Sequence, residues 1–286
     1  MEEVLRGDVG YDSTQLKTYM SCPFKYYLKF CLGLRLAKGV IQMLDIEFGQ
    51  RFHLFVERWY QGLTPSMEDI WGDFHNVESN TDKTKESGQK LCLDYTQRYD
   101  RDEYEILDVE YCHETDINGN KFITKLDTIV KLGEDTFSLE HKTTTSITAT
   151  TFSRLEMDMA MYAQTNAVNE KYGDCCGVIL NAAAIKNYKR KYKDIPVGLN
   201  SNFERHIVNK GPKECAEFKR TAGHWIDRIQ TDTCYPKALG GSACTMYRGC
   251  AYAELCSITD GLKVDDYVAD AMFETVNPFE YLTEGE

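Results

Sequence analysis

Two stretches near the middle of the chain carry β-branched and aromatic residues in strand-like runs, and together they predict a β-hairpin. The first covers residues 121–131 and the second covers residues 136–142. Residues 133–135 (Gly-Glu-Asp) lie between them and are typical of a turn. Three further strands are expected from apolar runs or alternating character, at residues 104–114, 176–185 and 203–209.

Helical periodicity covers much of the remaining chain. Near the start, a helix capped at Asp12 or Ser13 is expected to break at Cys22 and Pro23 and to continue as a second, aromatic and lysine-rich helix. Residues 64–90 are polar and predict a loop or a loosely ordered helical connection. Further helices are predicted over residues 44–60, 91–101, 152–170 and 212–230. Strands and helices in this order indicate an α/β core with a helical cap.

Composition narrows the class of protein. The 286 residues contain no stretch of about 18 apolar residues that could span a membrane, and the N-terminus is too acidic and polar for a secretory signal, so we expect a cytosolic protein. The net charge of −12 argues against a general nucleic-acid coat. It does not exclude a nuclease, because metal ions neutralise an acidic site and local basic patches can hold a phosphate backbone.

The predicted hairpin carries candidate chemistry near its ends. Asp127 lies on the first strand, while Glu140 and Lys142 are two residues apart on the second and so project from one face. Two carboxylates suit a hard divalent cation, and a neighbouring lysine can orient or deprotonate a water that attacks phosphorus. The alternative is a surface hairpin with ordinary salt bridges.

Two further residues could join this site. Gly49 and His53 are four residues apart and share one face of the 44–60 helix, so the glycine permits another element to approach closely near the histidine. His53 could equally be a buried, hydrogen-bonded histidine. Glu110, on the 104–114 strand, is a candidate acidic ligand or an exposed strand glutamate.

A basic patch stands out in this acidic chain. In the segment KNYKRKYKD, five basic residues alternate with Tyr188 and Tyr192 on an expected hairpin tip. Positive charge interleaved with aromatic rings suits single-stranded nucleic acid, although a solubilising loop has the same composition. The basic residues of the tip are Lys186, Lys189, Arg190, Lys191 and Lys193.

The eleven cysteines do not indicate a disulfide framework, because the count is odd and the expected compartment is reducing. Clustered cysteines suggest metal binding, while the isolated ones suggest core packing. Cys244, Cys250 and Cys256 are spaced six residues apart, and Cys22 or Cys234 could add a fourth thiolate. A soft sulfur site of this kind selects zinc or an iron–sulfur cluster.

Taken in order, these motifs resemble the RecB-type nucleases of the PD-(D/E)XK superfamily over nearly the whole chain. The resemblance rests on a Cys-Pro followed by an aromatic-basic helix, a Gly-x-x-x-His helix, a strand Asp, a Glu-x-Lys strand, a helix carrying Tyr162 and three closing cysteines. More narrowly, the chain is similar to the iron–sulfur branch, which includes the AddB nuclease domain, the CRISPR adaptation exonucleases and stand-alone phage relatives.

The resemblance implies a restriction-endonuclease-like core, in which helices flank a central mixed sheet. It also implies that His53, Asp127 and Glu140 would ligate Mg²⁺ or Mn²⁺ and that Lys142 would position the attacking water. Tyr162 would match the tyrosine of the family's Gln-x-x-x-Tyr helix, where Asp158 stands in place of the usual glutamine. Leu126 replaces the proline that names the superfamily.

The same resemblance implies a structural 4Fe–4S cluster that would staple the two ends of the chain together. Its ligands would be Cys22, Cys250 and Cys256, with Cys244 as the preferred fourth ligand and Cys234 as the reserve. Zinc held by the same cysteines is the alternative. The six-residue spacing from Cys244 to Cys250 is wider than the Cys-x-x-Cys spacing with which the family's cysteine triplet usually begins.

The implied function is a metal-dependent deoxyribonuclease, an exonuclease that hydrolyses phosphodiester bonds at single-stranded DNA ends. Two alternatives are a nuclease subunit that depends on a helicase or on a recombination or integration partner, and a DNA-binding scaffold without turnover. The compact stand-alone form leans toward a phage origin.

We expect four functional segments along the chain. The acidic end could dock a partner or shield the protein, or it could be a frayed, solvated terminus. The segments are an N-terminal helical region at 1–102, the nuclease core at 103–233, the iron–sulfur segment at 234–259 and the acidic tail at 260–286.

Overall fold

A computed structural model describes residues 9–37, 41–76, 82–191, 193–239, 242–245, 249–257 and 273–283. The chain divides into two compact units, which we describe separately. The sheet unit comprises residues 44–113 and 125–216, and the terminal unit comprises residues 1–43, 114–124 and 217–286. The four segments expected from the sequence divide the chain differently and stay a prediction.

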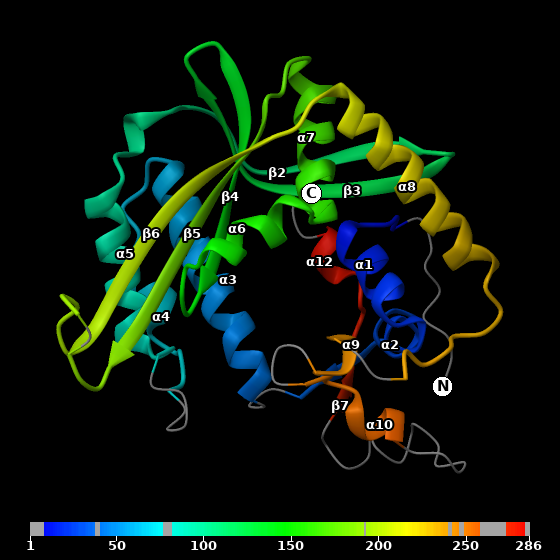
Figure 1. Cartoon of the computed structure of the whole chain (residues 1–286), viewed down its shortest axis with the longest axis horizontal. Coiled ribbons are helices and arrows are strands. Elements are labelled where there is room, and N and C mark those ends of the chain that lie inside the picture. Colours follow the sequence, from blue (N-terminus) through cyan, green and yellow to red (C-terminus); the bar gives the residue numbers. More distant parts are fainter. Residues whose placement is uncertain are drawn as a thin grey trace. The chain divides into compact units, whose positions relative to one another are not determined.

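The sheet unit is built on a five-stranded mixed sheet (Figure 1). Its strand order is β2-β3-β4-β5-β6, and β4 pairs in parallel with β5, whereas β3–β4 and β5–β6 are antiparallel. The predicted hairpin is therefore confirmed as β3 and β4. The strands are β2 (Glu105–Ile117), β3 (Asn120–Leu132), β4 (Asp135–Thr144), β5 (Gly177–Tyr188) and β6 (Gly198–Asn209).

Successive residues of β5 point to opposite sides of the sheet, and helices of the sheet unit pack on both sides. Ile179 and Ala183 pack with α3 (Ile41–Tyr60), α4 (Met67–Trp71) and α5 (Lys85–Arg98). Val178 and Leu180 pack instead with α6 (Ala149–Glu156) and α7 (Met159–Tyr172). The expected α/β class, with helices flanking a mixed sheet, is confirmed.

Two helix predictions need correction. The expected helix over residues 152–170 is two helices, because the chain breaks at Met157 and Asp158 caps α7 by accepting a hydrogen bond from the Ala160 N–H. The helix expected at residue 91 begins at Lys85, where Thr84 and Ser87 form a reciprocal capping box. The polar connection before it contains the short helix α4.

The terminal unit contains the expected broken N-terminal helix. Asp12 caps α1 (Ser13–Ser21), and the chain then breaks at Cys22 before α2 (Pro23–Tyr26) and a π-helical turn (Tyr27–Cys31). Pro23 begins α2 without loss, since the first helical N–H has no partner within the helix. The part of α8 (Pro212–Thr231) from Glu217 onward belongs to the same unit.

Part of the acidic tail is folded, so the expectation of a frayed terminus is wrong for residues 273–283. The strand β7 (Phe273–Thr275) pairs antiparallel with β1 (Leu34–Leu36), and the Tyr281 hydroxyl donates to Asp12 at 2.9 Å. Phe279 and Leu282 are buried there, which explains why this part orders despite its charge. Residues 260–272 lie outside the described residues.

No helix within the described ranges is long and apolar enough to cross a membrane.

Candidate active site

The sheet unit brings together the acidic residues of the predicted hairpin. Asp127, on β3, accepts a hydrogen bond at its Oδ2 from the backbone N–H of His141, on β4, at 2.9 Å. Glu140 and Lys142 flank His141 and point to one face, and the Lys142 Nζ contacts Glu140 Oε1. The alternation of a β-strand therefore does what the sequence predicted: it places a carboxylate and an ammonium side by side.

His53 reaches the same carboxylate from α3. Its Nδ1 lies 3.3 Å from Asp127 Oδ1. One helical turn earlier, a Cβ on Gly49 would lie 3.3 Å from Thr143 Oγ1, a tighter approach than side chains usually make. The small residue thus lets β4 approach the helix near His53, as expected from the four-residue spacing.

Glu140 is buried and held on a second side by α7. Its Oε2 accepts a hydrogen bond from Gln164 Nε2 at 2.5 Å, and Gln164 Oε1 accepts one from Ser138 Oγ at 2.9 Å. Sequence reasoning missed Gln164. The sequence did not single it out, because Gln164 is followed directly by the polar residues Thr165 and Asn166 and its partner Glu140 lies 24 residues away.

Charges within the site favour ionised partners. Burial alone would raise the pKa of Asp127, but the charge and hydrogen bond of His53, together with the charge of Lys142, outweigh it and hold that pKa well below its usual range. Burial lowers the pKa of His53, yet Asp127 raises it above the ordinary value on balance. For Lys142, partial desolvation opposes the charge, while Glu140 and Asp127 raise the pKa to about 12. Lys142 is therefore an ammonium at neutral pH in this arrangement.

Beneath the site lies a second residue that the sequence analysis missed. His141 is buried, its Nδ1 lies 3.0 Å from Asn181 Nδ2, and burial lowers its pKa to about 3, so the ring is neutral. Its position between Glu140 and Lys142 implies the opposite face of β4, and its ring stacks on Tyr60 there. His141 therefore serves the site through its backbone N–H.

Three other candidates are placed differently from the four residues above, although the charge of Asp158 acts on Lys142 and that of Asp127 acts on Glu110. Asp158 is the N-cap of α7 rather than a residue on its face. Tyr162 packs with the Val178 side of the sheet, and the Lys210 Nζ lies 4.1 Å from its ring. Glu110 is exposed in the middle of β2 with a φ of +51°, and desolvation followed by Asp127 raises its pKa to about 7.

The donor set suits a divalent ion in its chemistry. Carboxylates are the preferred ligands of Mg²⁺ and Mn²⁺, and imidazole binds several transition metals, so the side chains of Asp127, Glu140 and His53 are of the right chemical type. Among the residues that the structure describes, however, no three His, Cys, Asp or Glu side chains are arranged closely enough to hold an ion. In the described arrangement, Lys142 and Gln164 occupy the two oxygens of Glu140 instead.

The basic tip follows the end of β5. Lys189, Arg190 and Lys191 are exposed, and the Lys186 Nζ lies 5.6 Å from the centre of the Tyr188 ring. The second tyrosine of the expected patch, Tyr192, is outside the described residues. The tip therefore presents positive charge beside at least one aromatic ring.

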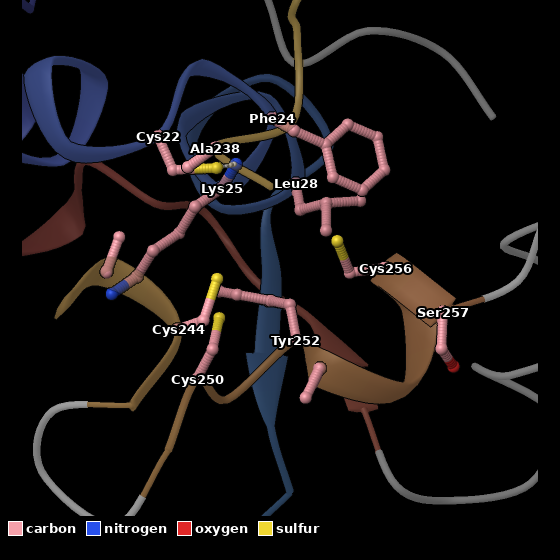
Figure 2. Close-up of a pocket in the computed structure, with 12 residues that line it drawn as sticks. Cys22, Phe24, Lys25, Leu28, Ala238, Cys244, Cys250, Tyr252, Cys256 and Ser257 are labelled. Carbon is pink, nitrogen blue, oxygen red and sulfur yellow. Dashed lines mark hydrogen bonds between the residues drawn. The ribbon is translucent and has the colours of Figure 1, made fainter. Parts of the chain in front are cut away.

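Four cysteines of the terminal unit line one cavity of about 250 Å³. Figure 2 shows the sulfur atoms of Cys22, Cys244, Cys250 and Cys256 facing this space. Desolvation raises the pKa of the Cys256 thiol, and the three other cysteines raise it further. The reserve ligand, Cys234, is exposed and does not line the cavity.

Local structure places two of these cysteines. Cys22 is the N-cap of α2, and its Sγ accepts a hydrogen bond from the Lys25 N–H at 3.5 Å. Cys256 belongs to α10 (Ala253–Ser257), and the Lys237 Nζ donates to its carbonyl at 2.6 Å. Four cysteine side chains around one cavity are a donor set whose chemistry suits zinc or an iron–sulfur cluster.

A likeness to a solved structure bears on the fold. A protein from Eubacterium rectale described as a "Putative exonuclease" has a TM-score of 0.52 at 10% identity, and the similarity covers 92% of this chain and 94% of that one. At this identity the likeness shows the fold alone. The structure of SSO0001 has a TM-score of 0.35 at 15% identity and covers 80% of each chain, which is too weak to carry an argument. No curated protein matches the chain.

The family comparison is more direct. The sequence model of the PD-(D/E)XK nuclease superfamily matches residues 13–257, which include the hairpin carboxylates and all four cysteines of the cavity. Because this match covers well over half of the chain, the protein belongs to the PD-(D/E)XK nuclease superfamily.

Proposed function

We propose that this nuclease is a metal-dependent exonuclease acting on single-stranded DNA ends. The observation that carries the proposal is the convergence of His53, Asp127, Glu140 and Lys142 in the sheet unit. A divalent ion there would act as a Lewis acid on the scissile phosphate and lower the pKa of a water molecule. His53, Asp127 and Glu140 are the residues that would hold it.

The side chains of the site have separate roles in this proposal. The His141 N–H fixes the orientation of the Asp127 carboxylate. Lys142, protonated beside Glu140, orients the attacking water by donating a hydrogen bond and stabilises the negative charge that develops on phosphorus. Because the ammonium holds its proton firmly in this arrangement, orientation is better supported than proton abstraction.

We expect metal-dependent shortening of single-stranded DNA labelled separately at its 5′ and 3′ ends, with Mn²⁺ or Mg²⁺ and protein purified anaerobically. The label that disappears first gives the direction of digestion. Chelation of the metal should stop the reaction. If cleavage is absent with a fully loaded cysteine site, the exonuclease proposal fails and a partner-dependent or binding-only protein becomes the better explanation.

The basic tip would hold the DNA backbone in this function, with Tyr188 offering a ring to an unstacked base. We expect the triple variant Lys189→Ser, Arg190→Ser, Lys191→Ser to bind single-stranded DNA more weakly while kcat stays near the wild-type value. Each lost phosphate contact should reduce the slope of log affinity against log salt by about 0.7.

Lys131→Ser, which removes a lysine at the β3–β4 hairpin, is the matched control and should leave the salt slope unchanged. An unchanged salt slope in the triple variant would exclude the tip from DNA binding.

We also propose that Cys22, Cys244, Cys250 and Cys256 hold a 4Fe–4S cluster with a structural role, with zinc as the alternative occupant. The cavity that all four cysteine side chains line supports this proposal. Cys22 precedes α2 and Cys256 lies on α10, so the group would cross-link segments that are distant in sequence within the terminal unit.

A further inference from the structure

Among the contacts described above, Gln164 is the buried side chain of α7 that forms a hydrogen bond with a proposed metal ligand, Glu140. Its side chain is 3% exposed and spans Ser138 and Glu140, which are two residues apart on β4 and therefore share a face. The contact is entirely internal to the sheet unit. Gln164 cannot reach solvent, so its amide has a single set of partners.

Those partners fix which way the amide points. The Glu140 carboxylate can only accept hydrogen bonds, so the NH₂ end of Gln164 must face it, at 2.5 Å. The Gln164 oxygen then faces the Ser138 hydroxyl, which can donate to it at 2.9 Å. A flipped amide would set two acceptors against each other at Glu140. Ser138 and Glu140 therefore hold Gln164 in one orientation.

This arrangement makes the two oxygens of Glu140 different. Oε2 is held by a buried, neutral donor. Oε1 faces the cationic Lys142, whose side chain is 41% exposed, whereas the Glu140 side chain is only 6% exposed. A neutral amide orients the carboxylate without cancelling its charge, as a second cation would. Oε1 is thus the oxygen left for an incoming cation.

We propose that Gln164 is a positioning residue that locks Oε2 of Glu140 and so presents Oε1 to the metal ion. The proposal rests on the function proposed above, because it takes Glu140 as a ligand. Gln164 touches neither substrate nor ion; it acts through Glu140, and Ser138 in turn holds Gln164. Removing a residue that hydrogen-bonds to a metal ligand typically lowers the metal affinity by about 10–100-fold.

The test is Gln164→Met, which keeps the length of the side chain and removes both hydrogen bonds. We expect the dissociation constant for Mn²⁺, measured by titration calorimetry without DNA, to rise about 10–100-fold. In cleavage assays the half-saturating Mn²⁺ concentration should rise in parallel, while KM for DNA at saturating Mn²⁺ changes little. A purely structural role would instead lower the thermal midpoint and leave the Mn²⁺ affinity of the folded protein unchanged.

Two further variants complete the test. Ser138→Ala frees the amide but leaves Gln164 in place, so it should weaken Mn²⁺ binding in the same direction by a smaller factor, even where Gln164→Met does not fold. Thr165→Val is the matched control, because Thr165 is buried on the same helix and its hydroxyl bonds to the Met161 carbonyl at 2.8 Å.

The outcomes separate the two proposals. Wild-type Mn²⁺ affinity in both Gln164→Met and Ser138→Ala, or in Ser138→Ala alone where Gln164→Met does not fold, would overturn the positioning role. Weakened Mn²⁺ binding in a protein that never cuts DNA would support the positioning role while the exonuclease function fails. Failure of wild-type protein to bind Mn²⁺ would overturn both.

Discussion

Replacing Lys142 with alanine should abolish strand cleavage while DNA binding is retained. The reason is positional, because Lys142 is the ammonium that contacts Glu140 and lies in the electrostatic field of Asp127. Removing one group that stabilises transition-state charge typically lowers kcat by about 10²–10³-fold. The loss here should be at least that large, since the same residue would also orient the attacking water. End-labelled single-stranded DNA gives the rate, and filter binding at low metal gives the affinity.

Two controls make this result specific. Lys131→Ala removes a lysine from the neighbouring strand β3 and should leave the rate unchanged. Lys142→Arg retains the charge but replaces a compact ammonium by a planar fork, so we expect it to recover only part of the rate. Turnover at the wild-type rate in Lys142→Ala would remove the lysine from the mechanism.

The hairpin was predictable from sequence because its signals are local. β-branched and aromatic positions indicated both strands, Gly133 marked the turn, and a two-residue spacing placed Glu140 and Lys142 on one face. His53 was harder, because its link to Asp127 joins residues far apart in the chain. The Gly49 spacing supplied the missing hint, which the approach to Thr143 explains.

Other parts depended on tertiary contacts that no local pattern shows. The apolar residues on both sides of Asp158 continue a helical pattern, so the sequence did not indicate the break at Met157. The break is defined in the structure by Asp158, which caps α7 by accepting a hydrogen bond from the Ala160 N–H. Gln164 looked like an ordinary helix residue because its partners lie on β4. In the acidic tail, charge masked the few aromatic residues, such as Phe279, that bury and order the segment.

A cluster in the cysteine cavity should have a large effect on the stability of the protein. In the terminal unit, Tyr252, Leu255 and Phe273 pack against Leu28 and Leu34, and the Tyr252 hydroxyl donates to the Leu34 carbonyl at 2.7 Å. These contacts join the C-terminal segment to the N-terminal helices over a small apolar area. A cluster bound by Cys22 and the C-terminal cysteines would close a loop of more than 200 residues. By analogy with disulfides, such a cross-link contributes about 5 kcal/mol to the free energy of unfolding.

The Cys22→Ser variant removes a proposed cluster ligand without removing the N-cap of α2. Serine is a good N-cap, so the hydrogen bond that Cys22 Sγ accepts from the Lys25 N–H can be replaced by one to the serine hydroxyl. The variant therefore loses a sulfur ligand while α2 keeps its cap. We expect the brown colour and the bound iron of anaerobically purified protein to be lost. The thermal midpoint should fall by on the order of 10 °C, since a change of 1 kcal/mol shifts it by about 2–4 °C in a domain of this size.

Cys234→Ser is the matched control, because Cys234 is exposed and lies outside the cavity, and it should keep both iron and stability. A colourless wild-type protein that contains zinc would replace the cluster by a zinc site with the same ligands and the same expected loss in Cys22→Ser. Wild-type protein without iron or zinc, together with an unchanged midpoint in Cys22→Ser, would show that the four thiols form no metal site. The N-terminal and C-terminal segments of the terminal unit would then be joined by apolar packing, which includes Tyr252 and Leu255, and by the pairing of β1 with β7.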